Sequence, residues 1–163
     1  MSKLVLVTGG TRGIGAAIAK RLKDDGNEVI STFIGQEEAA KKYTEETGIK
    51  TYKFDVGYFE SCQKGIEEVE KSTGKTVDVL VNNAGITRDR FLHKMSVDEW
   101  NAVINTNLNS AFNMTRCVIE KMRAKGYGRI INISSINGIK GQIGQANYSA
   151  AKAGLIGFTK AVA

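Results

Sequence analysis

Short apolar runs recur along the chain, and each is followed by a segment whose apolar residues keep the spacing of a helix. The first run, Leu4 to Val7, is wholly apolar, as expected for a strand buried on both faces of a parallel sheet. Further strands are predicted at 28–33, 77–81 and 129–133, and on the alternating residues Tyr52, Phe54 and Val56. Strands that alternate with helices favour an α/β fold with a doubly wound parallel sheet.

A long helix is predicted after Ser96. Ser96 and Glu99 have the spacing of a capping box, and an apolar stripe runs from Trp100 to Met122. We expect Trp100 to pack in the core. Asn107 lies on the stripe and must be hydrogen-bonded if it is buried, either as a bridge to a loop or as part of a site.

The composition excludes several classes of protein. The chain has 163 residues, of which 42% are hydrophobic and 25% charged, which fits one globular domain. No apolar run approaches the length of about 18 residues that a membrane span needs, so we expect a cytoplasmic protein. Cys62 and Cys117 lack metal-ligand spacing and are interpreted as buried apolar residues, and no metal site is expected. The net charge of +6 is spread along the chain, which favours an anionic small molecule over nucleic acid.

A glycine-rich loop lies between the first strand and the first helix. It reads Thr8-Gly9-Gly10-Thr11-Arg12-Gly13-Ile14-Gly15. Glycines let a pyrophosphate approach the backbone, and the helix N-terminus offers free N–H groups to it. A tight turn without a ligand is the alternative, although so many glycines are costly without a use.

The end of the second strand indicates which dinucleotide would bind. An NAD site normally has an acid there to hold the ribose hydroxyls. Here the segment reads Ser31-Thr32-Phe33-Ile34-Gly35, and Glu28 lies at the other end of the strand. Because no acid would repel a 2′-phosphate and Arg12 could meet it, we predict NADP(H).

Tyr148 and Lys152 are four residues apart on a predicted helix, so their side chains should lie on one face. A nearby ammonium favours phenolate and could make the tyrosine an acid useful near neutral pH. Such pairs are common, however, and this one alone is also compatible with a half-exposed helix without a catalytic role.

Several motifs together resemble the short-chain dehydrogenase/reductase family: the glycine loop, Asn82-Asn83-Ala84-Gly85, Asn107, and Ser135 followed by Tyr148 and Lys152. The resemblance covers the whole chain and implies a Rossmann-like fold. The segments 82–89 and 137–149 are most similar to those of acetoacetyl-CoA reductases, with 3-oxoacyl-[acyl-carrier-protein] reductases as close relatives. The implied activity is NADPH-dependent reduction of a 3-oxoacyl thioester to the 3-hydroxyacyl thioester, on coenzyme A or, alternatively, on acyl carrier protein.

The resemblance also implies residue roles. Tyr148 would donate a proton to the carbonyl oxygen, Lys152 would hold the cofactor ribose, Ser135 would bond the substrate oxygen, and Asn107 would anchor a relay water. Substrate contacts would come from Ser135, Gln142, Gln145 and Tyr148. Cofactor contacts would come from Gly9, Thr11, Arg12, Gly13, Ile14, Gly15, Asp55, Val56, Asn83, Ala84, Gly85, Tyr148 and Lys152.

The C-terminal end of the sequence suggests a truncation, because the chain stops at Ala163 inside an apolar-periodic helix. We expect residues 1–163 to form one dinucleotide-binding domain that lacks the family's last strands and substrate lid. The strand at 129–133 would then have an open edge. The resemblance further implies that the helices carrying Asn107 and Tyr148 form a homo-oligomer interface. A non-catalytic remnant that at most binds nucleotide is the alternative to an active enzyme.

Overall fold

The computed structural model describes residues 2–163 and contains a five-stranded parallel sheet with the strand order β3-β2-β1-β4-β5. The chain builds outward from β1 to β3, then crosses back to place β4 on the other side of β1. The predicted doubly wound α/β fold is confirmed. The strands are β1 (Leu4–Val7), β2 (Glu28–Phe33), β3 (Lys50–Lys53), β4 (Val79–Asn82) and β5 (Arg129–Asn132).

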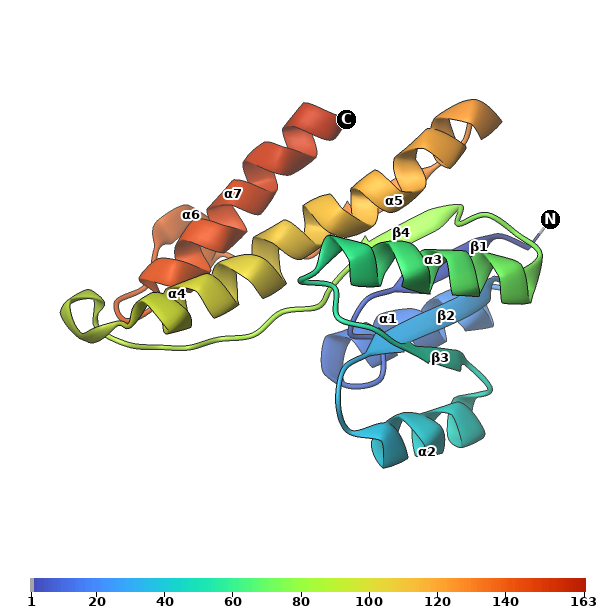
Figure 1. Cartoon of the computed structure of the whole chain (residues 1–163), viewed down its shortest axis with the longest axis horizontal. Coiled ribbons are helices and arrows are strands. Elements are labelled where there is room, and N and C mark those ends of the chain that lie inside the picture. Colours follow the sequence, from blue (N-terminus) through green and yellow to red (C-terminus); the bar gives the residue numbers. More distant parts are fainter. Residues whose placement is uncertain (1) are drawn as a thin grey trace.

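Helices connect the strands and cover both faces of the sheet, and α4, α6 and α7 extend beyond the strands as an arm (Figure 1). None of the helices in residues 2–163 is long and apolar enough to cross a membrane. The helices are α1 (Gly13–Asp24), α2 (Glu37–Thr47), α3 (Phe59–Thr73), η1 (Leu92–Lys94), α4 (Val97–Ile104), η2 (Asn105–Asn109), α5 (Ser110–Lys125), α6 (Asn137–Lys140) and α7 (Ala146–Val162).

The buried strands β1, β2 and β4 divide the core into two layers, because successive side chains point to opposite faces. Leu4 and Leu6 pack with residues of α3 and α5, whereas Val5 and Val7 pack with residues of α1. Cys62 lies in the first layer, where burial raises the pKa of its thiol to about 12. The predicted burial is confirmed for Cys62, whereas Cys117 is only half-buried and packs against the same layer.

The prediction for the third strand was wrong in its position. β3 ends at Lys53, and Phe54 and Val56 lie beyond it. Both side chains are buried in the layer under α3, which explains why they alternate with polar neighbours. The N–H of Phe54 still donates to Phe33 O in β2 at 3.2 Å, but the next N–H, that of Asp55, donates to the Ser61 hydroxyl at 3.0 Å.

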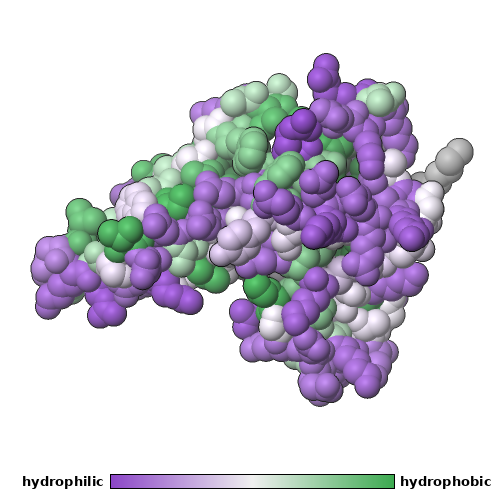
Figure 2. All heavy atoms as spheres, in the orientation of Figure 1, coloured by the Kyte–Doolittle hydropathy of each residue, from purple (hydrophilic) through white to green (hydrophobic). Residues whose placement is uncertain are grey.

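The prediction that Trp100 packs in the core was also wrong, because 37% of the residue is exposed. The capping box of Ser96 and Glu99 is present as predicted and begins α4. However, α4 lies beyond the strands and packs against α7 instead of the sheet (Figure 1). Apolar residues are accordingly visible over this arm, whereas hydrophilic residues dominate over α2 and α3 (Figure 2).

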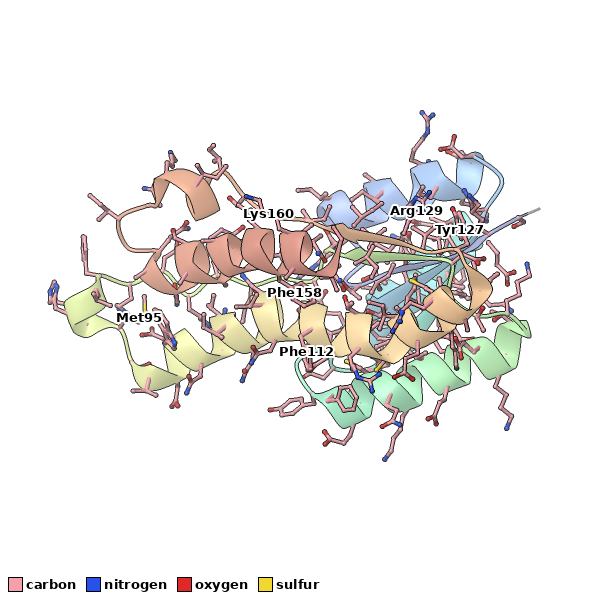
Figure 3. The ribbon with its side chains drawn as sticks, turned by 90° about the horizontal axis from the view of Figure 1, so that it is seen from above. Met95, Phe112, Tyr127, Arg129, Phe158 and Lys160 are labelled. Carbon is pink, nitrogen blue, oxygen red and sulfur yellow. The ribbon has the colours of Figure 1, made fainter. Side chains whose placement is uncertain are left out.

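β5 is an outer strand, as expected, and within residues 2–163 it pairs with β4 alone. Ile131 in its middle is 44% exposed. At its start, two cations lie near the Tyr127 ring, with Lys3 Nζ 4.3 Å and Arg129 Cζ 5.0 Å from the ring centroid. Tyr127 and Arg129 lie side by side in Figure 3.

Asp78 joins the start of the sheet to α5. Its buried carboxylate accepts hydrogen bonds from the backbone N–H of Leu4, at 2.9 Å, and from Lys125 Nζ. Burial raises the pKa of Asp78, but the hydrogen bonds from Lys125 and Leu4 outweigh burial and hold the pKa below its usual value.

We predict that Asp78→Asn lowers the free energy of unfolding by about 1–2 kcal/mol at pH 7, because the N–H of Leu4 loses a charged acceptor. Because the pKa of Asp78 is lower in the folded state, its carboxylate stabilises the fold at pH values above the unfolded pKa of about 4. This stabilisation is lost as the pH falls through the lower pKa of the folded state. The difference between parent and variant should therefore shrink in acid. Urea unfolding at several pH values measures it. Glu37→Gln removes an exposed ion pair with Lys53, which solvent screens, and should leave the urea midpoint nearly unchanged.

Candidate functional site

The glycine loop runs from the end of β1 into α1, and residues of β2 form hydrogen bonds with it. The hydroxyl of Ser31 donates to Gly10 O at 3.2 Å, and the N–H of Gly10 donates to Thr32 O at 3.1 Å. A Cβ at Gly10 would lie 2.4 Å from the Ser31 hydroxyl oxygen, so only glycine fits there. The two hydroxyl residues of β2 therefore fix the loop where it approaches the helix N-terminus.

The glycine loop and the segment after β4 are joined by Thr8. Its buried hydroxyl oxygen accepts the N–H groups of Asn83 and Ala84, both at 3.0 Å. The Asn83 side chain returns the contact, because its Nδ2 donates to Thr8 O at 2.9 Å and to Gly9 O at 3.2 Å. Asn83 thus braces the loop, and Gly15 fits beside it only because glycine has no side chain.

A cavity of about 540 Å³ opens at the carboxyl ends of the strands, beside the point where the chain reverses its direction across the sheet. This is where ligands bind in open α/β sheets, and the volume is in the range of small-molecule sites. Among the lining residues are eleven that we predicted as cofactor contacts: Gly9, Thr11, Arg12, Gly13, Ile14, Gly15, Asp55, Val56, Asn83, Ala84 and Gly85.

The charged side chains that line this cavity are Arg12 and Asp55. Arg12 is exposed at the N-terminus of α1, where a positive charge and free N–H groups both favour an anion. No acid lines the cavity at the end of β2. The first acid of α2, Glu37, pairs with Lys53, and this hydrogen bond lowers the pKa of the Glu37 carboxyl.

Asn107 lies in η2, a π-helical turn between α4 and α5, and its side chain is buried. Its Oδ1 accepts the N–H of Ile86 at 2.8 Å, and its Nδ2 donates to Ile86 O at 2.9 Å. The predicted bridge to a loop is therefore present. π-Helical turns often occur at functional sites, because they change the direction of a side chain.

Tyr148 and Lys152 lie on one face of α7, with Lys152 Nζ 5.7 Å from the centroid of the Tyr148 ring. Lys152 is only 4% exposed and forms no ion pair within residues 2–163. Its ammonium donates to Ile133 O at 2.6 Å, and burial lowers its pKa. The side-chain arrangement predicted from the i,i+4 spacing is thus confirmed.

Ser135 lies in the segment between β5 and α6, which packs against the same turn of α7. The neighbouring Ser134 hydroxyl donates to Lys152 O at 2.9 Å. A Cβ at Gly138 would lie 2.7 Å from the backbone carbon of Lys152, so this close approach needs glycine. The Ser135 hydroxyl accepts the N–H of Asn137 at 3.2 Å and remains partly exposed.

Gln142 and Gln145, the predicted substrate contacts, lie in different surroundings. Gln142 is exposed in the loop before α7. The Gln145 side chain is held on both sides, because its Oε1 accepts Asn137 Nδ2 at 2.9 Å and its Nε2 donates to Asp89 at 2.8 Å. A substrate contact by either residue stays a prediction.

Some residues of the site had not been predicted. Thr8 was assigned only to the loop pattern, and its joining of two loops had no sequence signal beyond a hydroxyl at the end of an apolar strand. For the contact of β2 with the loop, the sequence signal was the pair of hydroxyl residues, Ser31 and Thr32, inside a predicted strand. The additional cavity-lining residues are Thr32, Phe33, Ile34, Gly35, Gln36, Phe54, Ile86 and Thr106.

Comparison with known proteins identifies the class. The sequence profile of a family described as short chain dehydrogenase matches residues 3–163. Acetoacetyl-CoA reductases of Shinella zoogloeoides and Paracoccus denitrificans are each 60% identical over 163 residues, covering 100% of this chain and 67% of the relative. A 3-oxoacyl-[acyl-carrier-protein] reductase of Vibrio harveyi is 47% identical over 163 residues, covering 99% of this chain and 66% of the relative.

The chain belongs to the short chain dehydrogenase family, a class of oxidoreductases that implies a nicotinamide cofactor. It spans about two thirds of the length of these relatives and is similar to acetoacetyl-CoA reductases along its whole length. The cavity and the glycine loop fit a dinucleotide, since the residues that line them are small or uncharged except for Arg12 and Asp55.

We predict that Gly15→Ala weakens binding of the dinucleotide by about tenfold or more, equivalent to about 1.4 kcal/mol. The new Cβ would lie 2.5 Å from both Asn83 Nδ2 and Gly9 O, so the loop must move. Titration with NADH and with NADPH, followed by nicotinamide fluorescence, measures the effect. Gly157→Ala places a methyl group in open space on α7 and should leave both affinities unchanged.

Proposed function

We propose that the protein reduces a 3-oxoacyl thioester, acetoacetyl-CoA, to the 3-hydroxyacyl thioester with NADPH. The observation that carries this proposal is the combination of a dinucleotide-sized cavity with the paired Tyr148 and Lys152 on α7, which packs against η2 at the edge of the cavity. The names of the relatives support the thioester, since acetoacetyl-CoA reductases at 60% identity align with the entire chain.

The side chains support a division of roles. Tyr148 is the proton donor to the substrate carbonyl oxygen, and the nearby Lys152 ammonium stabilises the phenolate that remains. Ser135, whose hydroxyl is partly exposed, holds the carbonyl oxygen. Asn107 keeps the backbone of Ile86 fixed and orients a water toward Lys152. When bound, the nicotinamide supplies the hydride.

The preference for NADPH is supported by the charges around the cavity. Arg12 carries the cavity's positive charge and can pair with a 2′-phosphate, a group that guanidinium binds well. Phe33, Ile34 and Gly35 at the end of β2 offer no carboxylate to repel it, and Lys53 neutralises Glu37 nearby. The adenine would lie against Asp55 and Val56.

We further propose that residues 1–163 act as one dinucleotide-binding domain in the cytoplasm, and that copies associate through the helices carrying Asn107 and Tyr148. Phe112 on α5 supports this association, since 53% of the residue is exposed (Figure 3). Large apolar side chains that remain exposed on a helix often mark a contact between subunits.

Tyr148→Phe should abolish turnover of acetoacetyl-CoA, lowering kcat by about a hundredfold or more, because the general acid is lost. Loss of NADPH absorbance at saturating substrate measures turnover. NADPH affinity should change by less than about twofold, because the substitution removes only a hydroxyl and Tyr148 does not line the cavity beside the glycine loop.

Turnover that survives the substitution would contradict the assignment of Tyr148. Absence of turnover in the parent chain, together with retained NADPH binding, would support the alternative of a non-catalytic remnant. The same assay with a 3-oxoacyl group on acyl carrier protein decides between the two thioesters, and a strong preference for the carrier protein would overturn the choice of coenzyme A.

The parent chain should bind NADPH more tightly than NADH, and Arg12→Gln should remove about tenfold of this preference, or about 1.4 kcal/mol. The reason is that NADPH loses the cationic partner of its 2′-phosphate, whereas NADH has no 2′-phosphate and loses no such contact. Fluorescence titrations of both dinucleotides measure the ratio. Tighter binding of NADH by the parent chain would overturn the assignment of NADPH.

A further inference from the structure

Asn147 is the residue before Tyr148, near the start of α7, and it is fully buried with 0% exposure. A carboxamide has two N–H donors and one oxygen acceptor. Here Nδ2 donates to Arg88 O at 3.1 Å and to Glu99 O at 3.2 Å, and Oδ1 accepts the N–H of Tyr148 at 2.8 Å. Each hydrogen of the amide group and its oxygen therefore have a partner.

The three partners of Asn147 belong to three different segments, and two of these are far from Asn147 in the sequence. Arg88 lies in the loop between β4 and η1, Glu99 lies in the first turn of α4, and Tyr148 lies in α7. Neighbouring contacts join the same segments, because the N–H of Arg90 donates to Gly144 O at 2.8 Å. The Glu99 carboxylate also pairs with Arg90.

The bond from Tyr148 links this cluster to the proposed chemistry. The first N–H groups of a helix have no partner inside it, and a side chain that satisfies one of them fixes the first turn. The side chain that satisfies Tyr148 is also the bridge to the loop and to α4. The carboxamide of Asn147 is therefore the contact that ties the backbone of Tyr148 itself to these two segments.

We propose that Asn147 is a positioning residue for the reduction, which holds Tyr148 against the loop at 86–90 and α4 so that its phenol meets the substrate carbonyl. The inference rests on the proposed function of Tyr148. Misplacement of a reacting group by about 1 Å can cost about a hundredfold in rate, so a bridge of this kind affects kcat more than binding.

A matched residue separates positioning from stability. Asn113 on α5 is also buried, and its Nδ2 donates to Val56 O at 3.0 Å, at the adenine end of the proposed cofactor cavity and not at α7; for this reason its kcat is compared at saturating NADPH. Asn113→Ala removes a buried amide of the same kind without touching α7. It should lower the Tm as Asn147→Ala does, but should leave kcat at saturating NADPH unchanged.

The test compares acetoacetyl-CoA reduction by both variants. Asn147→Ala should lower kcat by about tenfold or more, while the Kd for NADPH stays within about twofold of the parent value. Asn147→Asp keeps the acceptor for Tyr148 but loses both donors, and it should lose kcat to a similar extent. Parent-like kcat in Asn147→Asp, or an equal loss of kcat in Asn113→Ala, would overturn the proposal.

Amide hydrogen exchange makes the test independent of turnover. In Asn147→Ala, exchange should accelerate by about tenfold or more at residues 86–99 and 146–152, while β1 and β4 keep their protection. Unchanged exchange in the two segments, or a uniform increase over the whole chain, would overturn the proposal. If the parent chain shows no turnover, the proposed function fails, and exchange alone decides whether Asn147 positions Tyr148.

Discussion

The hydroxyl of Thr8 is the contact on which the arrangement of the cavity depends. By accepting the N–H groups of both Asn83 and Ala84, it joins the loop after β1 to the loop after β4. These two strands are neighbours at the point where the chain stops adding strands on one side of β1 and begins on the other. This junction leaves the Asn83 amide free to brace Gly9, and it leaves beside Asn83 a space that only glycine can occupy at position 15. The shape of the cavity thus follows from hydrogen bonds between two loops, and the strands below supply a rigid base.

Buried amides hold the other part of the site. Asn107 and Asn147 each bind backbone groups of the segment between β4 and α4, at Ile86 and Arg88. An unsatisfied buried amide would cost about 1–3 kcal/mol, so such a contact is stable only when its partners stay in place. Because η2 and α7 each bind this segment, its position is determined from both sides. The segment from Ile86 to Arg90 is therefore positioned by side chains that lie far from it in sequence.

Much of the fold could be predicted from the sequence, since β1 and β2 occupy the ranges expected from their apolar runs. Prediction was less successful where burial continues beyond strand pairing: Phe54 and Val56 are buried like strand residues, yet β3 ends before them at Lys53. Trp100 was misplaced because periodicity identifies an apolar face without indicating how far the sheet extends beneath it. Most predicted cofactor contacts line the cavity, whereas the bonds made by Thr8 and Asn147 join distant segments and leave no local pattern.

Lys152 connects α7 to the sheet. A buried ammonium without a carboxylate is costly, and here a backbone carbonyl and an aromatic ring provide its surroundings. The carbonyl belongs to Ile133, directly after β5, and the N–H of Ile133 in turn donates to Asn82 O at the end of β4. The position of the Lys152 ammonium is therefore fixed by the end of β5, the outer strand of the sheet. In residues 2–163, β5 has a partner strand on one side only. A contact that shifted its open edge would shift Lys152 as well, through the carbonyl of Ile133.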